Sequence, residues 1–157
     1  LPSVQPDVEQ KQMNCYLDAR KAHTCCMVCS SRDNNPDTVN LMFSEQPDGS
    51  VCADYTANHR HQGNTGLLHG GMTSTLLDAA MTHCLFMQGV QALTAELTVR
   101  FISPVCTGDK LMVCARLLGQ RRGIYLLEAW LTKGQQTVAR ATAKFIVPSQ
   151  DIALAHR

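Results

Sequence analysis

The stretch Gly63–Gly89, Gly-Asn-Thr-Gly-Leu-Leu-His-Gly-Gly-Met-Thr-Ser-Thr-Leu-Leu-Asp-Ala-Ala-Met-Thr-His-Cys-Leu-Phe-Met-Gln-Gly, predicts one long helix. Glycines at its start allow tight backbone turns, and no further Gly or Pro follows until Gly89 ends the helix. Apolar side chains cover most of its circumference, which is typical of a helix buried in a protein core. Asp78 interrupts this surface in mid-helix, where aspartate is a poor helix former and gains nothing from the helix dipole. We therefore take Asp78 as the first candidate functional residue.

The residues after this helix change from a helical period to the alternation typical of β-strands. Apolar residues at every second position predict a strand over 93–101. Shorter patterns of the same kind predict strands over 111–117, 124–132 and 138–147. Turn sequences, including Arg-Arg-Gly and Lys-Gly-Gln-Gln, separate the last three.

Two more strands are expected before the helix. Segments 39–46 and 51–57 flank the sequence Pro-Asp-Gly-Ser and predict a hairpin, and residues 7–22 predict a short flanking helix. Strands in hairpin succession favour an antiparallel sheet, and only one long helix is available to cover it. The sequence thus predicts an α+β fold in which an antiparallel sheet curls around one long central helix.

Length and composition restrict the class of protein. The chain has 157 residues, 45% hydrophobic and 17% charged, which suits a single globular domain with a real core. A formal net charge of +1 gives no broad electrostatic surface for nucleic acid or an anionic membrane. No stretch approaches the length of a membrane span, and the first residues lack the pattern of a signal peptide. We expect a cytoplasmic protein with no nucleic acid or membrane partner.

The chain contains eight cysteines. We expect them to be reduced thiols, because the first residues lack the pattern of a secretory signal. Near the N-terminus, Cys26-Met-Val-Cys29 is a lone pair with His23 and Cys25 crowded beside it, whereas a zinc site needs a second ligand pair at suitable spacing. We therefore expect no metal, although a zinc or redox module at Cys25, Cys26 and Cys29 stays an alternative. The others in or beside apolar segments are expected to be small core residues: Cys52, Cys84, Cys106 and Cys114.

The start of the central helix is a candidate anion site. His69-Gly70-Gly71 places backbone without side chains where the first N–H groups of the helix lack partners and the dipole is positive. An oxyanion forming on a carbonyl would be stabilised there, and such a donor typically contributes about 3–4 kcal/mol to a transition state. The alternative is that both glycines only permit close packing of the helix on the sheet.

Asp78 is either solvated on a thin polar strip of the helix, paired with a buried partner, or functional. It lies eight residues after Gly70, about 12 Å along the helix axis at 1.5 Å per residue. One carbonyl group of a substrate cannot contact both Gly70 and Asp78 of the same chain. If the two act together, they come from different subunits of a two-fold dimer whose central helices run antiparallel, and the site lies at the interface.

These residues resemble a known family. His69-Gly70-Gly71, the following Thr-Ser-Thr-Leu-Leu-Asp78 and the strand ending in Phe-Ile-Ser-Pro-Val at 101–105 are similar to the hotdog-fold acyl-CoA thioesterases of the PaaI-like, 4-hydroxybenzoyl-CoA thioesterase-related group. The resemblance covers roughly residues 39–147. The upstream Cys-x-x-Cys with Asn35-Pro36 is similar to an N-terminal element of some bacterial members.

The resemblance implies a role for five residues. Asp78 matches the carboxylate that acts as nucleophile or as general base on water. Gly70 matches the glycine whose backbone N–H polarises the thioester carbonyl, with Gly71 beside it. Thr94 lies where relatives have a Ser or Thr that positions the water or the carboxylate. Asn64 is one position later than the Asn that relatives place near the lytic water.

The resemblance also implies a binding region. His69 belongs to the motif and is mainly structural, while Arg121 and Arg122 lie in a turn where relatives present a basic residue to the phosphates of coenzyme A. A solvated hairpin turn is an equally good explanation of the two arginines. Thiolate is a good leaving group, so one carboxylate and an oxyanion site suffice and no cofactor is expected.

Domain limits and competing functions follow from the same resemblance. We expect an N-terminal helical, Cys-containing extension over 1–38, a hotdog thioesterase domain over 39–148 and a tail over 149–157, assembled as a homodimer or a homotetramer. An acyl-CoA-binding hotdog protein without catalysis is the main alternative. A hydratase or dehydratase of this fold would need a paired His and Asp, which His59, His61 and His83 do not provide. The acyl group, aryl or aliphatic, stays open.

Overall fold

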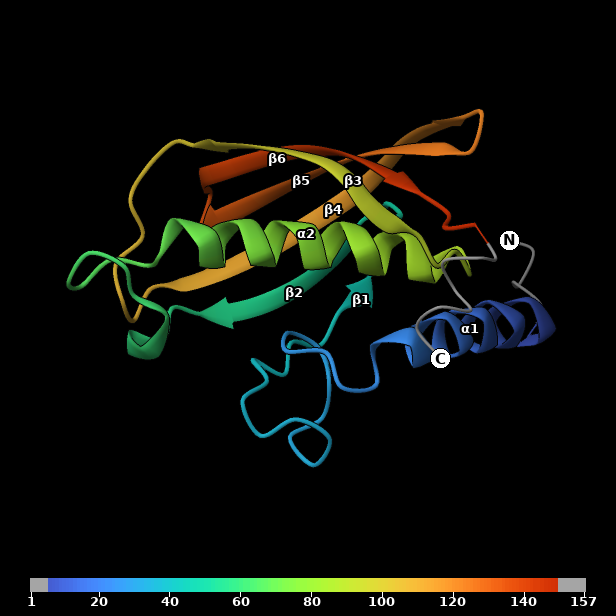
Figure 1. Cartoon of the computed structure of the whole chain (residues 1–157), viewed down its shortest axis with the longest axis horizontal. Helices are drawn as coiled ribbons and strands as arrows, with labels where there is room; N and C mark the ends of the chain where they lie inside the picture. Colours follow the sequence, from blue (N-terminus) through green and yellow to red (C-terminus); the bar gives the residue numbers. More distant parts are fainter. Residues whose placement is uncertain (1–5, 150–157) are drawn as a thin grey trace.

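The computed structural model describes residues 6–149 and contains one antiparallel six-stranded sheet wrapped around a long helix (Figure 1). The strand order across the sheet is β1-β2-β4-β5-β6-β3, so every neighbouring pair except β2·β4 and β6·β3 is a hairpin. This confirms the predicted α+β hotdog architecture. The strands are β1 (Ser44–Glu45), β2 (Val51–Thr56), β3 (Leu93–Phe101), β4 (Lys110–Arg121), β5 (Ile124–Lys133) and β6 (Gln136–Ile146).

Helix α2 (Gly70–Met87) lies across the concave face of this sheet and supplies the centre of the core (Figure 1). Leu76, Leu77, Ala80 and Met81 are fully buried against inward-facing residues of the strands. The helix ends where Gly89 takes a positive φ of 72°, a conformation that costs glycine little. Three large side chains of α2, Met72, Met81 and Phe86, are buried in the core, whereas Met87 is partly exposed.

Strand β3 occupies one edge of the sheet and contains a β-bulge. Its pairing with β6 shifts register between Thr94 and Glu96, so Thr94 opposes the buried Phe145 while Leu97 opposes the buried Ala143. Thr94 therefore faces α2 together with Leu97, although the alternation in the sequence puts them on opposite faces. The bulge turns Leu93 away from the core and leaves it 53% exposed.

The N-terminal segment packs against the outer side of α2. Helix α1 (Pro6–Arg20) is followed by a short 3-10 helix, η1 (Lys21–His23), and a second one, η2 (His59–His61), precedes α2. Tyr16 and Ala19 of α1 form a small buried cluster with Phe86 of α2. The predicted helix over 7–22 is thus confirmed within a few residues.

The predicted strand over 39–46 is wrong except at its end, because β1 contains only Ser44 and Glu45. Asn40 has a positive φ of 57°, which breaks an extended conformation. The backbone N–H groups of Val39 and Leu41 donate to carbonyl oxygens of Met27 and Val28 instead of to a strand. Residues 39–43 therefore pair with the cysteine-rich loop, and the domain boundary at residue 38 stays a prediction.

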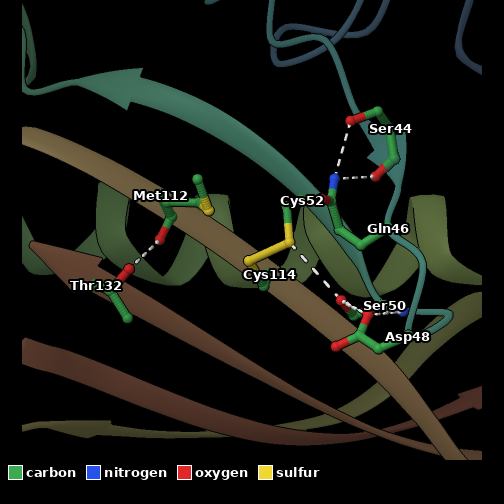
Figure 2. The surroundings of a disulfide bond; sticks show 8 residues. All are labelled: Ser44, Gln46, Asp48, Ser50, Cys52, Met112, Cys114 and Thr132. Carbon is green, nitrogen blue, oxygen red and sulfur yellow. Dashed lines mark hydrogen bonds between the residues drawn. A yellow bond between two sulfur atoms is a disulfide. The ribbon is translucent and has the colours of Figure 1, made fainter. Parts of the chain in front are cut away.

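The expectation that all cysteines are reduced is wrong for one pair. Cys52 of β2 and Cys114 of β4 are opposite each other in register, with Cα atoms 4.1 Å apart, and form a disulfide (Figure 2). Two cysteines directly opposite each other on neighbouring antiparallel strands are near enough to form a disulfide. No sequence motif predicts such a pair, because it depends on the register of the two strands. Cys84 is a buried core thiol as predicted, whereas Cys106 is exposed and is not a core residue.

Among residues 6–149, no helix has the length and apolar character needed to cross a bilayer. The predicted tail over 149–157 lies, apart from its first residue, outside the described residues.

Breaking the Cys52–Cys114 bond should destabilise the fold. The bond closes a loop with a sequence separation of 62, and the loop-entropy argument gives about 4 kcal/mol for a loop of this size. We expect the reductant tris(2-carboxyethyl)phosphine to lower the melting temperature by about 10 °C in differential scanning fluorimetry. The double variant Cys52→Ala/Cys114→Ala should melt at the same temperature as the reduced wild-type chain, with or without the reductant. Equal melting of the oxidised and reduced wild-type chain would contradict the bond's contribution.

Candidate active site

The first turn of α2 leaves one backbone donor free. His69 is the N-cap residue, and its Nδ1 atom accepts a hydrogen bond from the Gly71 N–H at 2.8 Å. The carbonyl oxygen of His69 accepts from the N–H groups of Met72 and Thr73. Within the described part of the chain, the N–H of Gly70 donates to no acceptor. Of the two predicted donors, Gly70 is therefore available to a ligand, while Gly71 is engaged by the histidine cap.

Gly70 lies between two clefts. One has a volume of about 300 Å³ and is bounded by Phe101, Pro104 and Thr73, and the other has a volume of about 600 Å³ and is bounded by Asn64, His69 and Pro104. A Cβ atom on Gly70 would meet the ring of Phe101 at 3.4 Å, which is ordinary van der Waals contact. The structure thus brings together Asn64, His69 and Gly70 at a surface where a ligand can approach the free N–H.

Asp78 and Thr94 form a second group of polar residues. The Thr94 hydroxyl donates to the Asp78 Oδ1 at 2.6 Å, from the bulged start of β3 to the middle of α2. Burial in the apolar surroundings raises the pKa of Asp78 above its usual range, and the Thr94 hydrogen bond opposes this shift. A desolvated carboxylate held by one hydrogen bond is a stronger base than a solvated one. Asp78 is half-buried. The alternative of a carboxylate that is simply solvated on a polar strip of the helix is therefore excluded.

The two groups are separate within one chain. Gly70 and Asp78 lie on the same straight helix, about 12 Å apart along its axis, and Gly70 packs near Phe101 at the far end of β3 from Thr94. The carboxylate and the free backbone donor of a single chain therefore lie too far apart to contact one carbonyl group.

Arg121 and Arg122 lie at the tip of the β4–β5 hairpin, and Arg122 has a positive φ of 54°. Both are exposed. The hairpin tip is level with the start of β3, because Ile124 pairs with Ile146, which in turn pairs with Leu93. The arginines therefore belong to the Asp78 and Thr94 end of the sheet and lie at the opposite end from Gly70 of the same chain.

The sequence profile of the thioesterase superfamily matches residues 65–139, which include α2, β3, β4 and β5. Slightly less than half of this chain is therefore similar to the thioesterase superfamily. Acyl-coenzyme A thioesterase 13 of Mus musculus is 26% identical over 93 residues, which are 58% of this chain and 66% of the mouse protein. The alignment thus spans slightly less than two thirds of that relative.

Solved structures share the fold of this chain. The PaaI protein of E. coli superposes with a TM-score of 0.71 over 88% of this chain and 96% of its own, at 19% identity. A Streptococcus mutans protein solved with acetyl-CoA bound gives a TM-score of 0.64 over 70% and 90% of the two chains, at 22% identity. At these identities the likeness establishes the fold.

Replacing Asp78 by asparagine should stabilise the fold at neutral pH. Because the pKa of Asp78 is raised in the folded state, folding binds protons, and stability decreases as pH rises from the unfolded pKa through the folded one. The neutral amide avoids this cost and keeps the Thr94 hydrogen bond. We expect Asp78→Asn to melt a few degrees higher than wild type at pH 7 and at nearly the same temperature below pH 4. A variant that melts lower at pH 7 would show that the carboxylate is stabilising.

Proposed function

We propose that this chain is an acyl-CoA thioesterase that hydrolyses an acyl-CoA thioester to the free acid and coenzyme A. The observation that carries this proposal is the pair of features on α2: a desolvated carboxylate oriented by Thr94 and a backbone N–H at Gly70 without a partner. Both lie within the segment that matches the thioesterase superfamily. Relatives named acyl-coenzyme A thioesterase 13 give the reaction class.

In the proposed reaction, the Gly70 N–H donates to the thioester carbonyl oxygen, whose negative charge grows as the tetrahedral intermediate forms. Asp78 acts as nucleophile or as general base on water, and Thr94 holds its carboxylate in position. Collapse of the intermediate breaks the C–S bond and expels the coenzyme A thiolate, which is a good leaving group. In the general-base route the free acid forms directly and the proton that Asp78 took from water passes to the thiolate; in the nucleophile route a mixed anhydride with Asp78 is left, and water then hydrolyses it to the free acid. Asn64 borders the cleft near Gly70, where it would help to hold the water.

A complete site in this proposal needs two chains. A two-fold axis beside the antiparallel α2 helices would bring the partner subunit's Gly70 to Asp78 and Thr94. The free edge of β3 supports such a contact: this nine-residue strand pairs on one side only, and its Phe101 is 58% exposed. A long exposed edge strand presents unpaired backbone N–H and C=O groups with which another chain can pair. We therefore propose a homodimer as the smallest active unit, with a tetramer of two such dimers also compatible.

The proposed substrate class rests on two kinds of support. The hotdog protein from Streptococcus mutans is described as bound to acetyl-CoA, and two exposed arginines of this chain, Arg121 and Arg122, lie at the Thr94 end of the sheet. Their guanidinium groups suit the phosphates of coenzyme A. The acyl group would then extend toward the cleft at the partner subunit's Phe101 and the partner subunit's Pro104.

Replacing Asp78 by asparagine should strongly decrease the rate of hydrolysis and leave the affinity for acyl-CoA nearly unchanged. Loss of the base or nucleophile should lower kcat about 10²–10⁴-fold in a thiol-release assay with aryl and medium-chain acyl-CoAs. Glu96→Gln is the matched control, because Glu96 is an exposed carboxylate on the same strand as Thr94 and should leave kcat unchanged. Acyl-CoA binding without hydrolysis by the wild-type chain would favour a non-catalytic acyl-CoA-binding protein.

The backbone donor has an unusually clean test. Gly70 is the first helical residue, where proline fits and removes the N–H, and His69 has the extended conformation that proline requires before it (φ −61°, ψ 134°). We expect Gly70→Pro to lower kcat about 10²–10³-fold with the fold intact. Gly70→Ala keeps the N–H and adds only a van der Waals contact with Phe101, so it should retain most activity. Equal losses in both variants would exclude the N–H as the donor.

Co-expression of two inactive variants distinguishes a shared site from one within a single chain. A dimer of Asp78→Asn with Gly70→Pro has one site with both groups intact and one with neither. Random assembly makes half of the dimers mixed, so about a quarter of wild-type activity should return. Absence of any recovery, with mixed dimers verified by mass spectrometry, would contradict the shared site.

A further inference from the structure

A second cluster of reactive side chains lies between the N-terminal segment and α2, away from Gly70. His23 of η1, Cys29 of the following loop and His83 of α2 have ligand atoms that all lie within 4.8 Å of one another. The His23 Nδ1 and Cys29 Sγ atoms are 3.4 Å apart. Nitrogen and sulfur ligands of a tetrahedral zinc ion, at bond lengths of about 2.0–2.3 Å, are about 3.3–3.8 Å from each other. The cluster therefore has close to the spacing of a zinc site before any adjustment.

His83 is the most unusual member of the cluster. It is 1% exposed, and its Nε2 is the buried side-chain nitrogen or oxygen without a hydrogen-bond partner among the described residues. The other ring nitrogen, Nδ1, contacts the Tyr16 hydroxyl at 2.9 Å, and the ring stacks on Phe43. A metal-binding histidine typically has one nitrogen fixed by a hydrogen bond and the other given to the metal. An orphaned buried nitrogen costs free energy unless something binds it.

Cys26 is the fourth residue that we assign to the site, although its Sγ is not one of the three ligand atoms that lie within 4.8 Å of one another. It precedes Cys29 by three positions, which is the spacing of paired zinc ligands, and its Sγ accepts the Val28 N–H at 3.3 Å. A cysteine binds metal as its thiolate.

We propose that His23, Cys26, Cys29 and His83 bind one zinc ion in a closed tetrahedral site that fixes the N-terminal segment to α2. Two thiolates and two imidazoles form the ligand set of many structural zinc sites, and four protein ligands leave no position for a substrate. The proposed zinc site differs from the sequence-based expectation of no metal, because that expectation rests only on ligands that are close together in the sequence. His83 lies 54 positions after Cys29 and was therefore missed.

A thiol–disulfide pair is the competing explanation of Cys26 and Cys29. That chemistry needs only the two thiols, and it gives no reason for two imidazoles beside them or for the unpartnered nitrogen of His83. Zinc accounts for all four side chains at once. Its binding would also add to folding free energy, since the ligands come from three separate segments that are brought together only in the folded chain.

The first test is the metal content of the purified chain. Expressed with zinc in the medium and passed through a desalting column, the wild-type protein should carry about one zinc per chain by inductively coupled plasma mass spectrometry. Cys29→Ser and His83→Phe should lose it. Cys25→Ser is the matched control, because Cys25 is exposed and adjacent to Cys26 but outside the cluster, and it should keep its zinc. Equal zinc loss in Cys25→Ser would overturn the ligand assignment.

The second test uses only wild-type protein and so does not depend on the folding of variants. Chain stripped of metal by a chelator should bind Co²⁺ at one equivalent, with the intense visible bands and thiolate charge-transfer absorption of a tetrahedral site. Zinc should then displace the cobalt and remove these bands. A stripped, reduced chain that binds no Co²⁺ would overturn the proposal, as would a purified chain without zinc whose Cys26 and Cys29 form a disulfide. Neither readout involves thioester hydrolysis.

Discussion

The structure depends on the burial of one apolar helix. Because α2 is apolar around most of its circumference, the sheet must curve around it, and the remaining side must be covered as well. Within the chain, helix α1 covers the region near Phe86. Asp78 lies on the side of α2 that faces the β3 edge, and among the described residues Thr94 is the hydrogen-bond donor to its carboxylate. The place where a single chain leaves its central helix incompletely covered is thus also the place where its carboxylate lies.

Much of this arrangement could be predicted from residue patterns, since helix period, strand alternation and turn sequences are local properties. The bounds of α2 and β3 and the hairpin at Arg122-Gly123 followed from them. Features that arise between distant segments could not be predicted in this way. The disulfide of Cys52 and Cys114 depends on the register of β2 against β4, and the cluster at His83 depends on how the N-terminal segment docks.

In the candidate site, too, some features could be predicted from the sequence and others could not. Asp78 was identifiable because it conflicts with its local surroundings, and such conflicts are retained mainly where function requires them. The difference between Gly70 and Gly71 was not visible in the sequence, because either glycine offers an N–H. It arises from the ring of His69, which turns back onto Gly71 and leaves its neighbour free. The orientation of one side chain therefore decides which of the two backbone N–H groups is free to bind a ligand.

The bulge in β3 makes the backbone pairing of this strand matter more than its composition. Thr94 and Leu97 share a face only because Ala95 is accommodated as an extra residue opposite β6. Deleting Ala95 would leave Thr94 and Leu97 two positions apart and therefore on the same face, whereas pairing Ala95 regularly with β6 would turn the Thr94 hydroxyl away from Asp78. The orientation of this hydroxyl thus depends on one unpaired backbone position, and a shift of pairing there would separate Asp78 from its partner while Leu97 stays in the core.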